Sequence, residues 1–233
     1  MPEIIQHPSP NRDSRGGQAI DILLLHYTGM VTGQAALDRL TDPAVEVSAH
    51  YLIEEDGRIF QLVAEEERAW HAGVSCWQGV RNINAHAVGI ELVNPGHEFG
   101  YRAFPEAQMA SLIPLCQAIV ARHGIAPERV IGHSDVAPLR KEDPGERFDW
   151  RRLAAAGIGL WPEDIPKLQQ VPSEATLRAQ LARFGYDLEE VPLFPVITAF
   201  QRHFRQEQVS GIPDLETASR LAGLLRLLEL ARA

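Results

Sequence analysis

The feature that most restricts the fold is an apolar run that ends in a histidine. Residues 19–26 read AIDILLLH, so four consecutive apolar residues directly precede His26. Such a run without alternation is typical of a strand buried on both faces of a sheet. A second short strand is expected over residues 129–133, in which Val-Ile-Gly precedes His133, and it runs into a loop. Because ligands of open α/β sheets bind beyond the carboxyl ends of the strands, the two imidazoles could converge on one point.

Strand-like and helix-like segments alternate along the first two thirds of the chain. The dipeptide Asp56-Gly57 separates two strand-like runs, which is typical of a β-hairpin. Residues 64–86 are polar, aromatic and irregular, and we expect a long functional loop there. The further elements expected are a helix over 33–40 capped by Thr32, strands over 50–54, 58–63 and 87–93, and a helix over 105–123 that ends before Gly124. This alternation predicts an α/β domain.

The composition changes after residue 159. Residues 160–172 contain Pro162, Pro166 and Pro172 and are predicted to be a linker. Three helical stretches are expected beyond it, since apolar residues recur there at helical spacing. These residues are Leu177, Leu181 and Phe184, then Val196, Ile197, Phe200 and Phe204, then Leu221, Leu224, Leu225 and Leu228. We therefore predict a main domain over 1–159, a linker over 160–172 and a small C-terminal three-helix domain over 173–233.

The charge balance excludes some classes of partner. The chain has 233 residues, with 22 Lys+Arg against 31 Asp+Glu, which gives a formal net charge of −9. This balance argues against a protein held to nucleic acid by bulk charge and against a polybasic membrane-surface protein. No apolar stretch approaches the ~20 residues that span a bilayer. We expect no nucleic-acid partner and no integral membrane segment; the oligomeric state stays open.

The N-terminal residues and the cysteines bear on the compartment. The start MPEIIQHPSPNRDSRGG lacks the apolar core and the cleavage site of a secretory signal. Two cysteines cannot form a disulfide framework, which fits a reducing compartment. We expect a cytoplasmic protein, although a chain whose signal had been removed would look the same.

One carboxylate complements the two histidines. Asp143 lies ten residues after His133, in the turn Asp143-Pro144-Gly145 that could hold it over the site. Two histidines and one carboxylate leave a fourth tetrahedral position for water, as in a catalytic zinc site. A charge of +2 from the metal and −1 from Asp143 leaves +1, which can lower the pKa of water toward about 7. Each residue alone also has a structural explanation. His26 or His133 could be a hydrogen-bonded structural histidine, and Asp143 could simply begin a turn.

Five stretches in order resemble a known enzyme family. They are LLLHYTGM, VSAHYLIEEDGRIFQLV, RAWHAGVSCWQG, AVGIELVN and VIGHSDVAPLRKEDPG, and together they span roughly residues 18–150. They resemble the zinc-dependent N-acetylmuramoyl-L-alanine amidases, whose superfamily includes peptidoglycan recognition proteins, and are most similar to the AmpD/AmiD branch. The resemblance implies an α/β fold with a central mixed β-sheet flanked by helices, and one Zn²⁺ per chain. It also implies hydrolysis of the amide between N-acetylmuramic acid, or its anhydro form, and L-alanine.

The resemblance also assigns roles to residues. His26, His133 and Asp143 match the metal ligands of the family. Glu91 matches the acid that activates water, and Lys141 matches the lysine that steadies the developing oxyanion. Amide hydrolysis needs these two functions. Without the resemblance, Glu91 could be a solvated strand acid and Lys141 an ordinary surface lysine.

Four further residues are predicted to contact the substrate. Trp70 offers an apolar face for a sugar or peptide, and His71 is a candidate contact or outer partner of the metal site. Arg81 and Asn84 could bind carboxylates of the peptide stem, which arginine pairs bidentately. Phage-type enzymes carry a tyrosine where this chain has Ala49, so we expect the proton transfers to depend on Glu91.

The C-terminal region resembles a peptidoglycan-binding domain in the stretches FGYDLEE, VITAFQRHF and GIPDLETASRLAGLL. The simpler alternative is a three-helix cap that packs on the amidase. The expected partner is peptidoglycan or a soluble muropeptide. A wall-binding domain favours the periplasm or the inner face of the outer membrane, whereas the missing signal favours cytoplasmic recycling, which we expect.

Two other classes of function compete with the amidase. A catalytically silent muropeptide-binding protein would have lost part of the ligand set, which is complete here. A cysteine hydrolase would pair Cys76 with His71, but two residues of one flexible loop give no fixed geometry for a thiolate and an imidazole.

Overall fold

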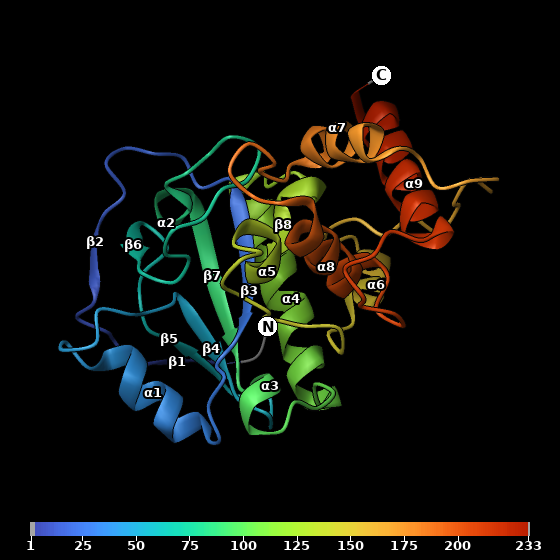
Figure 1. Ribbon diagram of the computed structural model, residues 1–233. Coiled ribbons are helices and arrows are strands. Elements are labelled where there is room, and N and C mark those ends of the chain that lie inside the picture. The colour runs from blue at the N-terminus through green and yellow to red at the C-terminus, as the bar shows by residue number, and fades with distance from the viewer. Residues whose placement is uncertain (1–2, 233) are drawn as a thin grey trace.

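The computed structural model describes residues 3–232 and is built around a mixed six-stranded sheet (Figure 1). The strand order is β1-β5-β4-β7-β3-β8, and only the β4–β5 hairpin is antiparallel. The strands are β1 (Ile4–Gln6), β3 (Ile22–Tyr27), β4 (Tyr51–Ile53), β5 (Ile59–Gln61), β7 (Ala87–Leu92) and β8 (Val130–Gly132). β2 (Arg12–Ser14) and β6 (Glu67–Ala69) form a separate antiparallel pair. The predicted α/β fold with a central mixed sheet is confirmed.

The helices begin and end largely where local chemistry predicts. They are α1 (Gly33–Thr41), α2 (Ile83–His86), α3 (Gly96–Phe99), α4 (Glu106–His123), α5 (His133–Val136), α6 (Trp150–Ala155), α7 (Glu174–Phe184), α8 (Leu193–Phe204) and α9 (Leu215–Arg232). The hydroxyl of Thr32 accepts a hydrogen bond from the amide of Ala35 and caps α1. Gly124, with φ of 65°, ends α4 in the left-handed conformation that glycine tolerates best.

The two faces of the sheet are covered by different parts of the chain. On one face, alternate residues of β3 and β7 pack against α4 in one apolar cluster. On the other face, Ile22 and Leu24 join a second cluster with Trp77 and with the C-terminal helices. Because side chains alternate along a strand, His26 and Glu91 belong to this second face.

The C-terminal helical unit, residues 173–232, shares its apolar core with this second face. Phe184 and Tyr186 pack edge-on against buried Trp77, with ring centroids 5.7 and 5.0 Å away. The amide of Gln78 donates to the carbonyl of Gly185 at 2.8 Å. In Figure 1, α7, α8 and α9 lie on the side of the sheet that carries β8, and α8 contacts α5.

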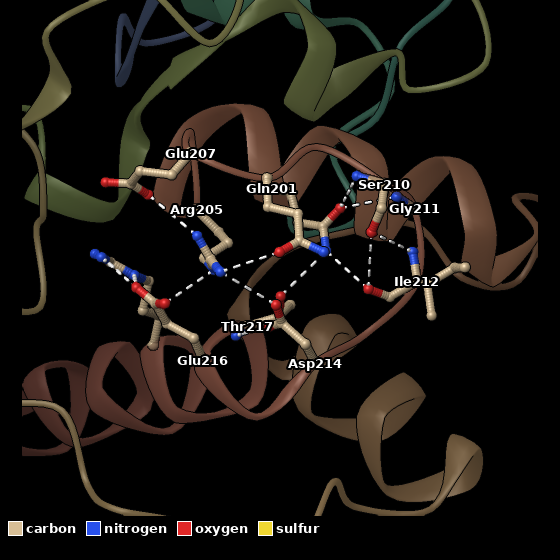
Figure 2. Close-up of polar contacts among 11 residues, drawn as sticks. Gln201, Arg205, Glu207, Ser210, Gly211, Ile212, Asp214, Glu216 and Thr217 are labelled. Atoms are coloured by element: carbon tan, nitrogen blue, oxygen red, sulfur yellow. Dashed lines mark hydrogen bonds and ion pairs between the residues drawn. The ribbon is translucent and has the colours of Figure 1, made fainter.

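The loop between α8 and α9 is held by one buried glutamine (Figure 2). The side-chain oxygen of Gln201 accepts hydrogen bonds from the amides of Ser210 and Gly211, both at 2.8 Å. Its NH₂ group donates to the carbonyl of Ile212 at 2.9 Å and to the hydroxyl of Thr217 at 3.1 Å. All four hydrogen-bonding positions of the amide are therefore used, within the unit itself.

Several short elements differ from the expectation. The predicted loop over 64–86 contains β6 and α2, and His133 begins α5 rather than a loop. β6 has the polar sequence Glu-Arg-Ala and is a strand only because residues 12–14 pair with it. Such distant pairing leaves no local signal. Within residues 3–232, no helix is both long enough and apolar enough to cross a membrane.

Candidate metal centre and active site

The register of the two central strands brings two predicted site residues together. β3 and β7 are parallel neighbours, and His26 lies directly opposite Glu91 in the pairing. β8 flanks β3 on its other side and ends at Gly132, so His133 follows at the same edge of the sheet. The carboxyl ends of three parallel strands thus gather these side chains at one point.

Three potential ligand atoms converge at this point. Nδ1 of His26 lies 2.9 Å from Nδ1 of His133, and Oδ2 of Asp143 lies 3.0 Å from each of them. All three residues are buried. Within residues 3–232, this His-His-Asp group is the cluster that could hold a metal ion.

Each histidine uses its second ring nitrogen for another contact. Nε2 of His133 lies 3.0 Å from the carbonyl oxygen of Ala72, and Nε2 of His26 lies 3.1 Å from Nδ1 of His71. A carbonyl only accepts, so Nε2 of His133 carries a proton, and Nδ1 is the ring nitrogen that would present its lone pair to a metal ion. Lone pairs and a carboxylate crowded this closely fit a bound cation, and the outer contacts fix the ring orientations.

The segment that makes these outer contacts is itself fixed. Oδ1 of Asn84 accepts hydrogen bonds from the amides of His71 and Ala72, at 3.1 and 2.8 Å. Gly89 gives His71 its room, because a Cβ at residue 89 would lie 2.6 Å from the imidazole ring. No sequence pattern points to the role of the Ala72 carbonyl, since every residue has a carbonyl.

Burial and neighbouring charges together shift the pKa values of His26, Asp143 and Glu91. Burial, and then the charge of His133, lower the pKa of His26 to about 4, so its imidazole is neutral near pH 7 and suited to metal binding. Burial opposes ionisation of Asp143, but His133 and His26 more than offset it and hold the pKa of its carboxyl well below the usual value. Burial, and then the charge of Asp143, raise the pKa of Glu91 well above its usual value.

A cavity of about 430 Å³ opens over the cluster. Glu91 and Lys141 line it together with His71, His133 and Asp143. Oε2 of Glu91 is buried and has no hydrogen-bond partner among the described residues. A buried unpaired carboxylate oxygen is costly, which is typical of a group that acts on a ligand. Sequence reasoning did not single out Tyr27, His97 and Arg140, which also line the cavity.

Comparison with known proteins identifies the family. The sequence profile of N-acetylmuramoyl-L-alanine amidases matches residues 16–146, more than half of the chain. The chain belongs to this amidase family. N-acetylmuramoyl-L-alanine amidase AmiD of Escherichia coli K12 is 40% identical over 231 residues, which cover 88% of this chain and 82% of AmiD. The 1,6-anhydro-N-acetylmuramyl-L-alanine amidase AmpD of Haemophilus influenzae is 39% identical over 170 residues, covering 65% of this chain and 90% of AmpD.

Solved structures agree. E. coli AmiD, in complex with the substrate anhydro-N-acetylmuramic acid-L-Ala-D-γ-Glu-L-Lys, has a TM-score of 0.81 at 37% identity, covering 93% of this chain and 98% of AmiD. AmpDh3 from Pseudomonas aeruginosa has a TM-score of 0.85 at 36% identity, covering 91% of this chain and 94% of AmpDh3. The predicted family, fold and class of enzyme, an amidase, are therefore confirmed.

Four residues were predicted to contact the substrate. Among the described residues that line the cavity over the cluster, His71 is present, but Trp70, Arg81 and Asn84 are not. The backbone of Trp70 is tied to Ser48, whose hydroxyl accepts from the Trp70 amide at 2.9 Å. The side chain of Arg81 pairs with Asp187 and Glu190 of the helical unit, at 3.1 and 3.2 Å. These partners lie more than 100 residues away in sequence, so the sequence could not reveal them.

Neither cysteine of the chain, Cys76 or Cys116, has the lowered pKa of a nucleophilic thiol. Burial, and then the charge of Asp187, raise the pKa of Cys76, whereas a nucleophilic cysteine needs a lowered one. Cys76 also lines different cavities from His71. Burial raises the pKa of Cys116, on α4, as well. The geometry gives no support to the cysteine-hydrolase alternative.

Proposed function

We propose that this chain hydrolyses the amide bond between N-acetylmuramic acid, or its anhydro form, and L-alanine. The observation that carries the proposal is the convergence of His26, His133 and Asp143 within 3.0 Å, beside the unpaired carboxylate of Glu91. The relatives are named as amidases of this same bond, which supports the proposal. The structure of one of them, AmiD of E. coli, was solved in complex with an anhydro-muramyl tripeptide.

We propose zinc as the metal, held by Nδ1 of His26, Nδ1 of His133 and Oδ2 of Asp143. Two imidazole nitrogens and one carboxylate oxygen are a donor set that Zn²⁺ uses in catalytic sites. When bound there, zinc would supply Lewis-acid chemistry, polarising the scissile carbonyl and lowering the pKa of water.

Glu91 is the proposed general base and acid. Its raised pKa brings the carboxyl closer to the pH range in which it can both take and return a proton. In the reaction it accepts a proton from the attacking water. It then delivers this proton to the nitrogen of L-alanine as the amide bond breaks, so that the amine leaves neutral.

Lys141 is the proposed stabiliser of the negative charge that develops on the carbonyl oxygen. It lines the same cavity, and the amide of Lys141 donates to the carbonyl of Ala137 at 3.0 Å, which fixes its backbone. A fixed cation beside a developing oxyanion lowers the energy of the transition state more than that of the substrate.

The decisive experiment measures zinc content and reaction products together. The purified protein would be incubated with anhydro-muramyl tripeptide, with and without a chelator, and analysed by mass spectrometry. We expect zinc near one per chain and chelator-sensitive release of a free peptide that begins with L-alanine. Metal bound without cleavage of this substrate or of polymeric peptidoglycan would favour the silent binding protein, and absence of both would contradict the proposal.

Two other predictions stay predictions. Binding of peptidoglycan by residues 173–233 is tested by sedimentation of the full chain with purified sacculi. The cytoplasmic location is tested by fractionation of cells that express the full-length gene product.

A further inference from the structure

A buried carboxylate joins the C-terminal helical unit to the predicted metal site. Asp135 is 1% exposed and accepts a hydrogen bond from the amide of Gly132 at 2.9 Å. Its remaining donors come from the helical unit: the hydroxyl of Tyr186 at 2.5 Å and Nδ1 of His203 at 2.8 Å. A buried carboxylate requires such donors, because water cannot replace them.

Asp135 belongs to the segment that carries two of the three predicted ligands. It lies in α5, two residues after His133. The amide of Ser134 donates to the carbonyl of Asp143 at 2.9 Å and so connects α5 to the other predicted ligand. A displacement of Asp135 would therefore move both His133 and Asp143.

The two donors from the helical unit are held rigidly. The ring of His203 is stacked between Trp150 and Phe204, with centroid separations of 3.7 Å on each side. Tyr186 is 3% exposed and packs against Trp77. Burial, and then the charge of Asp135, raise the pKa of Tyr186 well above its usual value, so its hydroxyl keeps the proton that it donates.

A third contact reaches the far end of the segment. Arg202, next to His203 on α8, pairs with Glu142 at 2.8 Å and lies 4.0 Å from Glu146. Glu142 directly precedes Asp143. The side chain of Glu142 is 48% exposed, so this ion pair contributes less than the buried hydrogen bonds to Asp135.

We propose that the C-terminal helical unit positions the metal-binding segment of the amidase, with Tyr186 and His203 as positioning residues that act through Asp135. This inference rests on the proposed metal site and adds a role for the unit beyond binding of the cell wall. It predicts that changes in the unit, outside the cavity, alter metal binding.

The test measures metal binding by the full chain. Tyr186→Phe removes only the hydroxyl, and His203→Leu removes the second donor. We expect each to weaken Zn²⁺ binding severalfold, measured by competition with a chromophoric chelator. The expected loss is below the ~10–100-fold typical of direct hydrogen-bond partners of metal ligands, because Tyr186 and His203 act one step further out, through Asp135. We also expect a changed visible absorption spectrum when Co²⁺ replaces Zn²⁺. His203→Asn, whose amide nitrogen can take the place of Nδ1, should restore much of the affinity.

Gln201→Ala is the matched control. It removes a buried set of hydrogen bonds inside the same unit, and none of the side-chain contacts of Gln201 reaches residues 132–146. We expect a lower melting temperature with unchanged Zn²⁺ affinity and an unchanged Co²⁺ spectrum. If Tyr186→Phe and His203→Leu bind Zn²⁺ like the wild type, or if Gln201→Ala weakens binding equally, the inference is wrong. A wild-type protein that binds no metal would remove the proposed function and this inference with it.

Discussion

The two faces of the central sheet are held by different interactions. The face toward α4 presents mainly apolar side chains and is covered by α4 together with residues 148–158, which include α6. The opposite face carries His26, Gly89 and Glu91 on the same strands and is covered by loops and helices from distant parts of the chain. Stability on the first face comes mainly from burial of apolar side chains, whereas the second face must also orient the polar groups of the site. Changes on the first face should therefore alter folding, and changes on the second should alter metal binding and catalysis.

The largest effect is expected on the polar face. Glu91→Gln keeps the size of the side chain but removes the proton transfer, so turnover of anhydro-muramyl tripeptide should fall on the order of 10²–10⁴-fold. Zinc content should stay near that of the wild type. Glu106→Gln, on the exposed end of α4, is the control and should turn over normally. Near-normal turnover of Glu91→Gln would remove this residue from the mechanism.

The apolar face should respond in the opposite way. Leu112 on α4 is fully buried in the apolar cluster that also contains residues of β3 and β7. Leu112→Ala should lower the free energy of unfolding by about 2–5 kcal/mol, because it leaves a cavity. Urea unfolding measures this change, and chelator competition should give an unchanged Zn²⁺ affinity. A large loss of affinity would mean that the two faces are coupled.

Acid should destabilise the polar face through a buried histidine. Burial, and then the charge of Arg15, lower the pKa of His50 to about 3, and its Nδ1 accepts from the amide of Gly89. The folded state keeps His50 neutral, so this stabilisation is present above pH 6.5 and is lost as the pH falls toward 3, by up to about 1.4 kcal/mol per unit. His50→Asn keeps an acceptor and does not titrate. Between pH 7 and 5, metal-free wild type should lose about 2 kcal/mol more than this variant; equal losses would contradict the assignment.

The smallest expected effect comes from a single methyl group. Gly89→Ala places a Cβ 2.6 Å from the ring of His71, which should displace the partner of His26 and weaken Zn²⁺ binding about tenfold. A double-mutant cycle with His71→Ala tests the cause. If the methyl group acts through His71, it should have little further effect once that ring is removed. Additive losses would show that it acts elsewhere.

Local chemistry predicted more of the apolar face than of the polar one. Pro105 in the first turn and Gly124 just past the end were enough to predict α4, and the Asp-Gly turn was enough to predict the β4–β5 hairpin. Glu91 was recognisable as a carboxylate in an otherwise apolar strand. The strand ends and the Asp-Pro-Gly turn allowed His26, His133 and Asp143 to converge. The order and register of the three strands, on which the convergence depends, could not be read from spacing alone.

Long-range partners account for what the sequence did not reveal. Arg81 was expected to bind a carboxylate of the peptide stem because arginine pairs carboxylates bidentately. In the structure it pairs with Asp187 and Glu190, and nothing in the sequence indicates this pairing. The spacing of the last three helices predicted a small three-helix domain, but not which residues it packs against. Because its apolar core is shared with Trp77, deletion of residues 173–233 should expose apolar surface around Trp77.

The carbonyl of Ala72 limits how this site can change. It accepts from His133 at 3.0 Å and from Arg140 at 3.1 Å, while the neighbouring imidazole of His71 contacts His26. Every amino acid has a main-chain carbonyl, so no substitution at residue 72 removes the acceptor for His133. The partner of Nε2 of His26 is the side chain of His71, which a mutation can replace. The two outer contacts of the metal site therefore differ in how mutation can change them. The contact of His133 is with a main-chain oxygen, whereas the contact of His26 can be changed by substitution of residue 71.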